Sequence, residues 1–411
     1  MKTRIAIIGG GASGMMAAIT AADHGAEVWI YEAKDRLGKK ILATGNGKCN
    51  FTNLVQEDSC YRGTVSNFSK AVREQFTVEN TLDFFKKIGI EPKIKNGYVY
   101  PNSEQAASVA DSLSMELRSK CVKVVQEQVY SVKGEEGAFL VKSEHGQNEF
   151  DKVILCCGSP AGMKNPKEFS GYSLAERFGH HITDLIPALV QLRCKEKWFK
   201  TISGVRCEGI IRVLENGIEI AKEKGELLFT EYGLSGIPVF QVSRFAGEAL
   251  NRGSKVTCKV DLLPRYSKEE LEALLIQRFE SLKGRTAEEL LVGLHNHKVN
   301  YVLLKELGID PVEDSKKAYD TSDFTKLANL YKELTCQVTE LNPFVNAQVC
   351  AGGVDTSEID DRTMESKLVR GLYFAGELVD VDGTCGGYNL QWAWSSGYVA
   401  GIHAASKKGN Q

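Results

Sequence analysis

A cluster of glycines near the start of the chain has the spacing of a pyrophosphate-binding turn. The hexapeptide Gly9–Gly14, GGGASG, fits the pattern G-x-G-x-x-G. In this pattern the first glycine permits a tight turn, the second lets the backbone approach the phosphates, and the third allows a helix to pack closely on a strand. Glu32 follows 18 residues after Gly14, where an acid accepts hydrogen bonds from both ribose hydroxyls. Because a carboxylate would repel a 2′-phosphate, the pattern predicts FAD or NAD rather than NADP.

The elements that must position this turn are readable on either side of it. Residues 4–8 are a short β-branched apolar run, typical of a parallel strand that is buried on both faces. The stretch MMAAITAADHG predicts a helix that ends near Gly25, and AEVWIYE predicts a second strand that ends in Glu32. The helix N-terminus would present N–H donors and a positive dipole to the phosphates.

A second strand–glycine–helix pattern lies more than 350 residues further on. LYFAGE predicts a buried strand that ends at Gly376 and Glu377, and Gly386-Gly387 precede a helix over 388–400. FAD is long enough to use both patterns, whereas NAD needs only the first. The second helix N-terminus would lie under the flavin ring and stabilise its anionic reduced form. The stretch before Val153–Cys157 alternates like a small β-meander, which we expect to close over the adenine.

Four sequence blocks resemble the BaiN-type flavoproteins, also described as aminoacetone-oxidase-like or NAD(P)/FAD-dependent oxidoreductases. The blocks are residues 9–18, 38–53, 227–244 and 351–397. The resemblance implies an α/β fold in which a Rossmann-like FAD-binding domain is built from both chain ends. It also implies an inserted β-barrel-like domain that carries a helical subdomain. We expect the FAD-binding domain at 1–189 and 350–411, the β domain at 190–264 and 334–349, and the helices at 265–333.

The motifs and the resemblance together predict the cofactor contacts. The loop ATGNGKCNFTN offers backbone N–H groups and amide side chains to the flavin and the pyrophosphate. Lys40 resembles a basic residue that neutralises the pyrophosphate in related folds. One departure is Cys350, where the family often has threonine. The residues expected to bind FAD are Gly9, Gly11, Ala12, Ser13, Gly14, Glu32, Ala33, Lys40, Gly45, Asn50, Val129, Gly158, Gly376, Glu377, Gly386, Gly387, Asn389 and Leu390.

The candidates for catalysis each have a structural alternative. Cys49 could donate a proton or exchange electrons near the flavin, with Cys60, 11 residues further on, left open as its redox partner. Alternatively, Cys49 could be a packed loop thiol. Tyr388 could donate a proton or pack in the core. Glu231 and Tyr232 belong to the segment LLFTEYGLSGIPVF, which we expect to reach over the flavin, and they are acid/base candidates.

Other chemistry-bearing residues predict structural roles. Cys385, just before a helix N-terminus, favours turn packing over reactivity, and Trp392 and Trp394 favour packing on the sheet. The pair His180-His181 predicts a helix cap. His295 and His297 lie on different faces of a predicted helix, so no metal site is expected.

The bulk composition excludes several classes of function. The net charge of −2 over 411 residues and the absence of a basic tract predict no nucleic-acid partner. No apolar run approaches the ~20 residues that span a bilayer. Eleven cysteines without C-x-x-C spacing fit reduced thiols in a cytoplasmic protein. The expected partner is a small-molecule substrate.

Three reactions remain open from the sequence. The first is NAD(P)H-dependent reduction of an activated C=C bond in a steroid- or bile-acid-like compound, which the family resemblance suggests. The second is oxidation of a small amine by O2, as in aminoacetone oxidase. The third is a non-enzymatic flavin-loaded redox sensor or RNA-associated protein. No second G-x-G-x-x-G follows Gly14, so NADH or NADPH has no dedicated domain and would act as a transient electron donor.

Overall fold

The structure, a computed structural model, describes residues 2–135, 137–282, 284–313, 315 and 319–406. The chain divides into two compact units, each with its own hydrophobic core. Unit 1 contains the residues up to Leu185 and those from Val349 onward, and unit 2 is Ile186–Gln348. Our expected boundaries were 189/190 and 349/350. The helices expected at 265–333 belong to unit 2.

Unit 1 is built around a five-stranded parallel sheet in the order β20-β11-β1-β2-β7. The apolar run of β1 is buried in the centre of this sheet, as a strand covered on both faces requires. The strand of this sheet that comes last in the sequence, β20, pairs with β11 through Val153 and Leu372. The expected Rossmann-like domain made from both chain ends is therefore confirmed. The strands are β1 (Arg4–Ile8), β2 (Glu27–Tyr31), β7 (Lys123–Val125), β11 (Lys152–Leu155) and β20 (Leu372–Phe374).

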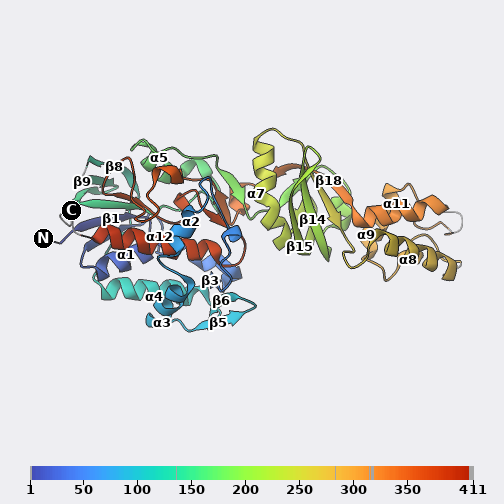
Figure 1. The fold of residues 1–411 in the computed structure, drawn as a ribbon, viewed down its shortest axis with the longest axis horizontal. Coiled ribbons are helices and arrows are strands. Elements are labelled where there is room, and N and C mark those ends of the chain that lie inside the picture. Colours follow the sequence, from blue (N-terminus) through green and yellow to red (C-terminus); the bar gives the residue numbers. More distant parts are fainter. Residues whose placement is uncertain (1, 136, 283, 314, 316–318, 407–411) are drawn as a thin grey trace. The chain divides into compact units, whose positions relative to one another are not determined.

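Two helices from opposite ends of the chain pack together beside this sheet. They are α1 (Ala12–Asp23) and α12 (Tyr388–Ala405), and Figure 1 shows them side by side. Glycines make the close approach possible. A Cβ atom on Gly397 would lie 2.4 Å from the Ser13 carbonyl oxygen, and one on Gly401 would lie 2.6 Å from that of Ala17.

Smaller elements complete unit 1. The predicted meander is confirmed as three antiparallel strands in the order β10-β9-β8. These are β8 (Val129–Glu135), β9 (Ala138–Ser143) and β10 (Gly146–Phe150). The other strands are β3 (Thr52–Asn53), β4 (Tyr61–Arg62), β5 (Pro92–Lys95), β6 (Tyr98–Pro101), β19 (Val349–Ala351) and β21 (Asp382–Gly383). The other helices are α2 (Phe68–Arg73), α3 (Val78–Lys87), α4 (Ala106–Ser119), α5 (Gly171–Glu176) and the 3-10 turn η7 (Gly376–Leu378).

Unit 2 is a closed six-stranded barrel with helices, which confirms the expected barrel-like insertion. The strand order around the barrel is β13-β16-β15-β14-β17-β18. The strands are β13 (Leu192–Cys194), β14 (Arg206–Glu215), β15 (Ile218–Thr230), β16 (Gly233–Ser235), β17 (Val256–Asp261) and β18 (Leu334–Leu341), and β12 (Ile186–Ala188) precedes them. The helices are α6 (Phe199–Ile202), α7 (Ile237–Asn251), α8 (Lys268–Ser281), α9 (His297–Glu306) and α11 (Thr321–Lys332).

The described residues contain neither a membrane-spanning helix nor a cluster of metal ligands. None of the described helices combines the length and the apolar character that a membrane crossing requires. Within the same residues, no group of three or more histidine, cysteine, aspartate or glutamate side chains has the geometry to hold a metal ion.

Candidate cofactor site

The glycine turn between β1 and α1 has the shape of a phosphate cradle. Gly9 has a φ of +106°, and a Cβ atom there would lie 2.4 Å from the Cys156 carbonyl oxygen. A Cβ atom on Gly14 would lie 1.9 Å from the Gly9 carbonyl oxygen. Gly11, the N-cap residue of α1, has open space where its Cβ would be. The first turn of α1 carries no acidic residue, so the turn is closed towards the protein and open towards an anion at the helix N-terminus.

Glu32, at the end of β2, holds the same turn from the side. One carboxylate oxygen accepts the N–H of Gly10 at 2.8 Å, and the other accepts the N–H of Lys34 at 2.7 Å. Each oxygen keeps a further lone pair. The carboxylate is therefore fixed beside the phosphate cradle, where it could accept ribose hydroxyls. Its neighbour Ala33 is exposed.

The second predicted pattern lies against the first. Gly376 follows β20 with a φ of +73°, and a Cβ atom there would lie 2.3 Å from the Ser13 hydroxyl oxygen at the start of α1. The indole N–H of Trp392 donates to the Gly376 carbonyl at 3.0 Å. The two glycine patterns, which are more than 350 residues apart in sequence, thus form one cradle.

An ion pair joins two further predicted cofactor residues. The ammonium group of Lys40 lies 2.5 Å from one oxygen of Glu377, and the other oxygen accepts the Cys350 N–H at 3.0 Å. The Lys40 side chain is half exposed. The Lys40 ammonium group, the Glu377 carboxylate and Cys350 therefore lie together beside the cradle.

The loop ATGNGKCNFTN packs against the N-terminus of α12. Gly387 has a φ of +96°, and a Cβ atom there would lie 2.6 Å from the Thr52 carbonyl oxygen. The Asn53 amide donates to the Gly386 carbonyl at 3.0 Å, and the Trp394 indole donates to the Phe51 carbonyl at 2.9 Å. Both tryptophans of α12 therefore hold backbone carbonyls of the cradle, in line with the structural role expected for them.

The remaining predicted cofactor residues are spread over unit 1. Asn389 bonds with both the N–H and the carbonyl of Gly383, each at 2.8 Å, so its amide stabilises the turn before α12. Asn50 accepts the Val99 N–H. Their contact with a cofactor stays a prediction, as it does for Gly45 in the loop, Val129 in β8, Gly158 after β11 and Leu390 in α12.

The comparisons with known proteins agree with this cradle. The family described as "HI0933-like protein Rossmann domain" matches residues 3–403. The chain belongs to the HI0933-like family. It is 42% identical to the 3-dehydro-bile acid delta(4,6)-reductase of Clostridium scindens over 410 residues, covering 98% of this chain and 99% of the relative. It is 31% identical to the ribosomal RNA dihydrouridine synthase of Escherichia coli over 401 residues, covering 96% of each.

A solved structure with a similar fold is the 3-ketosteroid-delta4-(5alpha)-dehydrogenase of Rhodococcus jostii, with a TM-score of 0.48 and 13% identity over 98% of this chain and 97% of that one. Family membership and the fit of the cradle to a dinucleotide make the HI0933-like chain an FAD-dependent oxidoreductase. The family resemblance seen in the sequence is thereby confirmed.

Cys49 of this HI0933-like protein is a packed thiol. Its side chain is fully buried, and burial raises its pKa to about 12. The thiolate is the reactive form of cysteine, so this environment favours the structural interpretation. All eleven cysteines lie among the described residues and none of them forms a disulfide bond, and Cys60 lies beside Tyr388.

Tyr388 lies at the first position of α12 and is only 7% exposed. Burial raises the pKa of its phenol well above the ordinary value, and the Cys60 thiol adds to the effect. The ring packs edge-on against Tyr61, with the centroids 5.7 Å apart. The phenol therefore keeps its proton at neutral pH, which a proton donor must do.

Glu231 and Tyr232 lie in unit 2, in the turn between β15 and β16. Glu231 is exposed. The Tyr232 hydroxyl accepts from the Asn342 amide at 3.1 Å, and the Arg193 guanidinium lies 5.1 Å from the ring centroid. Their role as acid or base stays a prediction.

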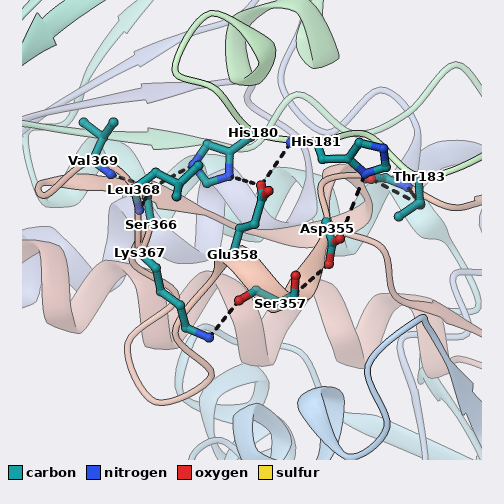
Figure 2. Close-up of polar contacts among 11 residues, drawn as sticks. His180, His181, Thr183, Asp355, Ser357, Glu358, Ser366, Lys367, Leu368 and Val369 are labelled. Atoms are coloured by element: carbon teal, nitrogen blue, oxygen red, sulfur yellow. Dashed lines mark hydrogen bonds and ion pairs between the residues drawn. The ribbon is translucent and has the colours of Figure 1, made fainter.

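The backbone of His180 caps α5, as predicted, because its N–H donates to the Ala175 carbonyl at 3.3 Å just beyond the last helical residue, Glu176. The side chain does not take part in this cap. Figure 2 shows His180 between Glu358 and Ser366. Its Nδ1 lies 3.0 Å from a Glu358 oxygen and its Nε2 2.7 Å from the Ser366 hydroxyl. The side chain is fully buried, and burial lowers its pKa. The neutral ring therefore donates through Nδ1 and accepts through Nε2.

The bond between His180 and Glu358 helps to hold the segment 354–358, which runs beside η7. Val354 donates its N–H to the Leu378 carbonyl at 2.9 Å and accepts the Asp380 N–H at 3.0 Å. Glu377 lies in η7, directly before Leu378. No motif in the sequence pointed to His180, Glu358 or Ser366 as a unit, because they meet only in the folded chain.

Proposed function

We propose that the protein is an NAD(P)H-dependent reductase of a C=C bond conjugated to a carbonyl, in a small steroid-like substrate. The observation that carries this proposal is the 42% identity to a 3-dehydro-bile acid delta(4,6)-reductase across almost the whole of both chains. A C=C bond conjugated to a 3-oxo group is electron-poor at its far carbon, so it accepts hydride there.

The reaction needs a hydride, a proton and a site that excludes water. Bound FAD would supply the hydride. The chain must supply the proton to the carbon next to the carbonyl. Tyr388 is the candidate that the structure supports best, because its phenol is protonated and it begins the helix at the cradle. Cys49 is disfavoured by its complete burial.

A second candidate substrate is a uridine in ribosomal RNA. The observation in its favour is the 31% identity to the Escherichia coli dihydrouridine synthase and the 30% identity to that of Haemophilus influenzae. The uracil ring also contains a C=C bond conjugated to a carbonyl, so the two reactions share their chemistry. The net charge of −2 and the absence of a basic tract favour the small molecule.

The electron donor is proposed to be NADH or NADPH, bound transiently. The only G-x-G-x-x-G pattern in the sequence is the one that forms the cradle. A nicotinamide would therefore enter the substrate pocket in turn with the substrate. The test must distinguish this NAD(P)H-dependent reduction from the oxidation of an amine by O2.

The test is an anaerobic stopped-flow experiment on the purified holoenzyme, followed through the visible absorbance of the flavin. We expect NADH or NADPH to bleach the flavin and a 3-oxo-Δ4 or Δ4,6 steroid to restore the colour rapidly. A saturated 3-oxo steroid is the matched control and should leave the flavin bleached. Recovery with ribosomal RNA transcript but not with steroid would transfer the proposal to uridine. Bleaching by a small amine, with peroxide release in air, would overturn it.

A further inference from the structure

Tyr172, at the start of α5, has a hydroxyl group for which the chain supplies no partner. The residue is only 7% exposed and its phenolic oxygen is buried. Among the described residues, no polar atom completes a hydrogen bond with that oxygen. A buried hydroxyl without a partner loses its bonds to water and gains none in return. Such a group calls for an explanation.

Tyr172 lies beside the glycine turn of the cradle. A Cβ atom on its neighbour Gly171 would lie 2.7 Å from the Cβ of Cys157, and the Cys157 thiol donates to the carbonyl of Ile8, the residue before Gly9. Burial raises the pKa of the phenol well above its ordinary value, and the Cys350 thiol adds to the effect. The backbone N–H of Cys350 donates to Glu377, whose other oxygen accepts from Lys40. The phenol therefore keeps its proton, and Glu377 is already engaged.

The other buried polar atoms that lack a partner differ from this hydroxyl. Glu196 and His295 belong to unit 2, and the Arg73 guanidinium already pairs with Asp58 through another nitrogen. The remaining two are the hydroxyl groups of Ser131 in β8 and of Thr356. Tyr172 is distinguished by its place beside the glycine turn.

We propose that the Tyr172 hydroxyl donates a hydrogen bond to bound FAD. FAD presents hydroxyl, phosphate and carbonyl oxygens along its length, and each of these accepts from a phenol. The ring of Tyr172 packs edge-on against Phe169, with the centroids 4.8 Å apart, which holds the phenol in place before the cofactor arrives. Tyr172 is therefore a cofactor-binding residue that no sequence motif marks.

This inference rests on FAD binding and not on the identity of the substrate, so the two can fail separately. The test compares Tyr172→Phe with wild type in two measurements on the full chain. The first is the rate at which FAD leaves the holoenzyme after dilution, read from the fluorescence of released flavin. The second is the midpoint of thermal unfolding of the flavin-free protein.

The expected results have opposite signs for binding and for stability. FAD should leave Tyr172→Phe about 3- to 10-fold faster, the effect of one lost hydrogen bond. The flavin-free variant should unfold at the same temperature as wild type or higher, because it no longer buries an unpartnered hydroxyl.

Tyr331→Phe is the matched control, since that buried phenol bonds to Asn300 at 2.7 Å. It should lower the flavin-free midpoint and leave FAD release unchanged. Unchanged FAD release in Tyr172→Phe would overturn the proposal whatever the midpoint does, because the hydroxyl would then bond to water or to the chain.

Discussion

At the scale of single residues, the site depends on side chains that hold backbone groups in place. Glu32 accepts the N–H of Gly10 in the glycine turn and the N–H of Lys34 in its own segment. Trp392 and Trp394 donate to carbonyls of two different segments of the cradle. Without these contacts, each of the polar groups would be buried without a hydrogen-bond partner. Substitutions at these residues should therefore act first on cofactor binding.

Replacing Glu32 by alanine should weaken FAD binding by roughly ten- to a hundredfold, the range for a lost charge-assisted hydrogen bond. The variant loses the acceptor for the ribose hydroxyls and the clamp on the Gly10 N–H. Flavin content after purification and titration with FAD measure the effect. Glu27→Ala, at the opposite end of β2, is the control. If Glu32→Ala is purified with full yellow occupancy, the assignment of Glu32 to the ribose is wrong.

The His180 contact should make the protein sensitive to acid. Because burial lowers the pKa of His180, the folded protein holds this ring neutral where the unfolded chain, with a pKa near ~6.5, takes up a proton. The stabilisation is complete above that value and is lost as the pH falls below it, by up to about 1.4 kcal/mol per pH unit. Denaturant unfolding of wild type and His180→Gln between neutral and mildly acidic pH measures the two slopes.

His180→Gln should have the shallower slope, even though it is less stable at neutral pH. His145→Gln serves as the control, because that side chain is 73% exposed. Equal slopes in wild type and His180→Gln would show that other buried histidines, such as His295 and His403, carry the pH dependence.

At the scale of elements, the cradle depends on the contact between α1 and α12. The two helices approach closely only where Gly397 and Gly401 face the backbone of α1. The same contact brings Ser13, in the first turn of α1, against Gly376. Helix packing and cofactor binding are therefore coupled at this point, because any side chain that separates the helices also moves the helix N-terminus that faces the phosphates.

Gly397→Ala should cost about 1–3 kcal/mol of unfolding free energy, the usual cost of forcing atoms into a packed interior. It should also speed FAD release, because the added methyl group meets the Ser13 backbone. Gly146→Ala is the control, since a Cβ atom there has open space. Unfolding in denaturant and FAD release from both variants check the prediction. Normal FAD release in a destabilised Gly397→Ala would show that packing and binding are independent.

At the scale of the whole molecule, the chain leaves unit 1 after Leu185, forms unit 2, and returns at Val349. The cofactor cradle described above belongs to unit 1 throughout. A ligand that binds the folded state stabilises it according to its concentration, by about 2.7 kcal/mol at a hundredfold excess over its Kd. Hydrogen exchange should therefore show FAD protecting the amides around Gly9–Gly14 and at the start of α12 more than those of barrel strands β14 and β17. Uniform protection of both units would contradict this.

The sequence by itself determined the parts of the site that are local. The glycine spacing, the buried strand before it and the acid after it lie within about thirty residues, and their geometry follows from backbone sterics and helix termini. The second pattern before α12 was readable for the same reason. The α/β class and the inserted barrel followed from these patterns and from the family resemblance, and the structure confirms both.

Only the tertiary structure decided which distant side chains meet. Lys40 pairs with Glu377 across 337 positions, and His180 lies between two residues more than 170 positions away. No sequence period around Lys40 or His180 identifies their partners. The partners depend on how the chain returns to the sheet. The burial of Cys49 and the unpartnered hydroxyl of Tyr172 are likewise properties of packing, because burial is set by neighbours that are remote in sequence.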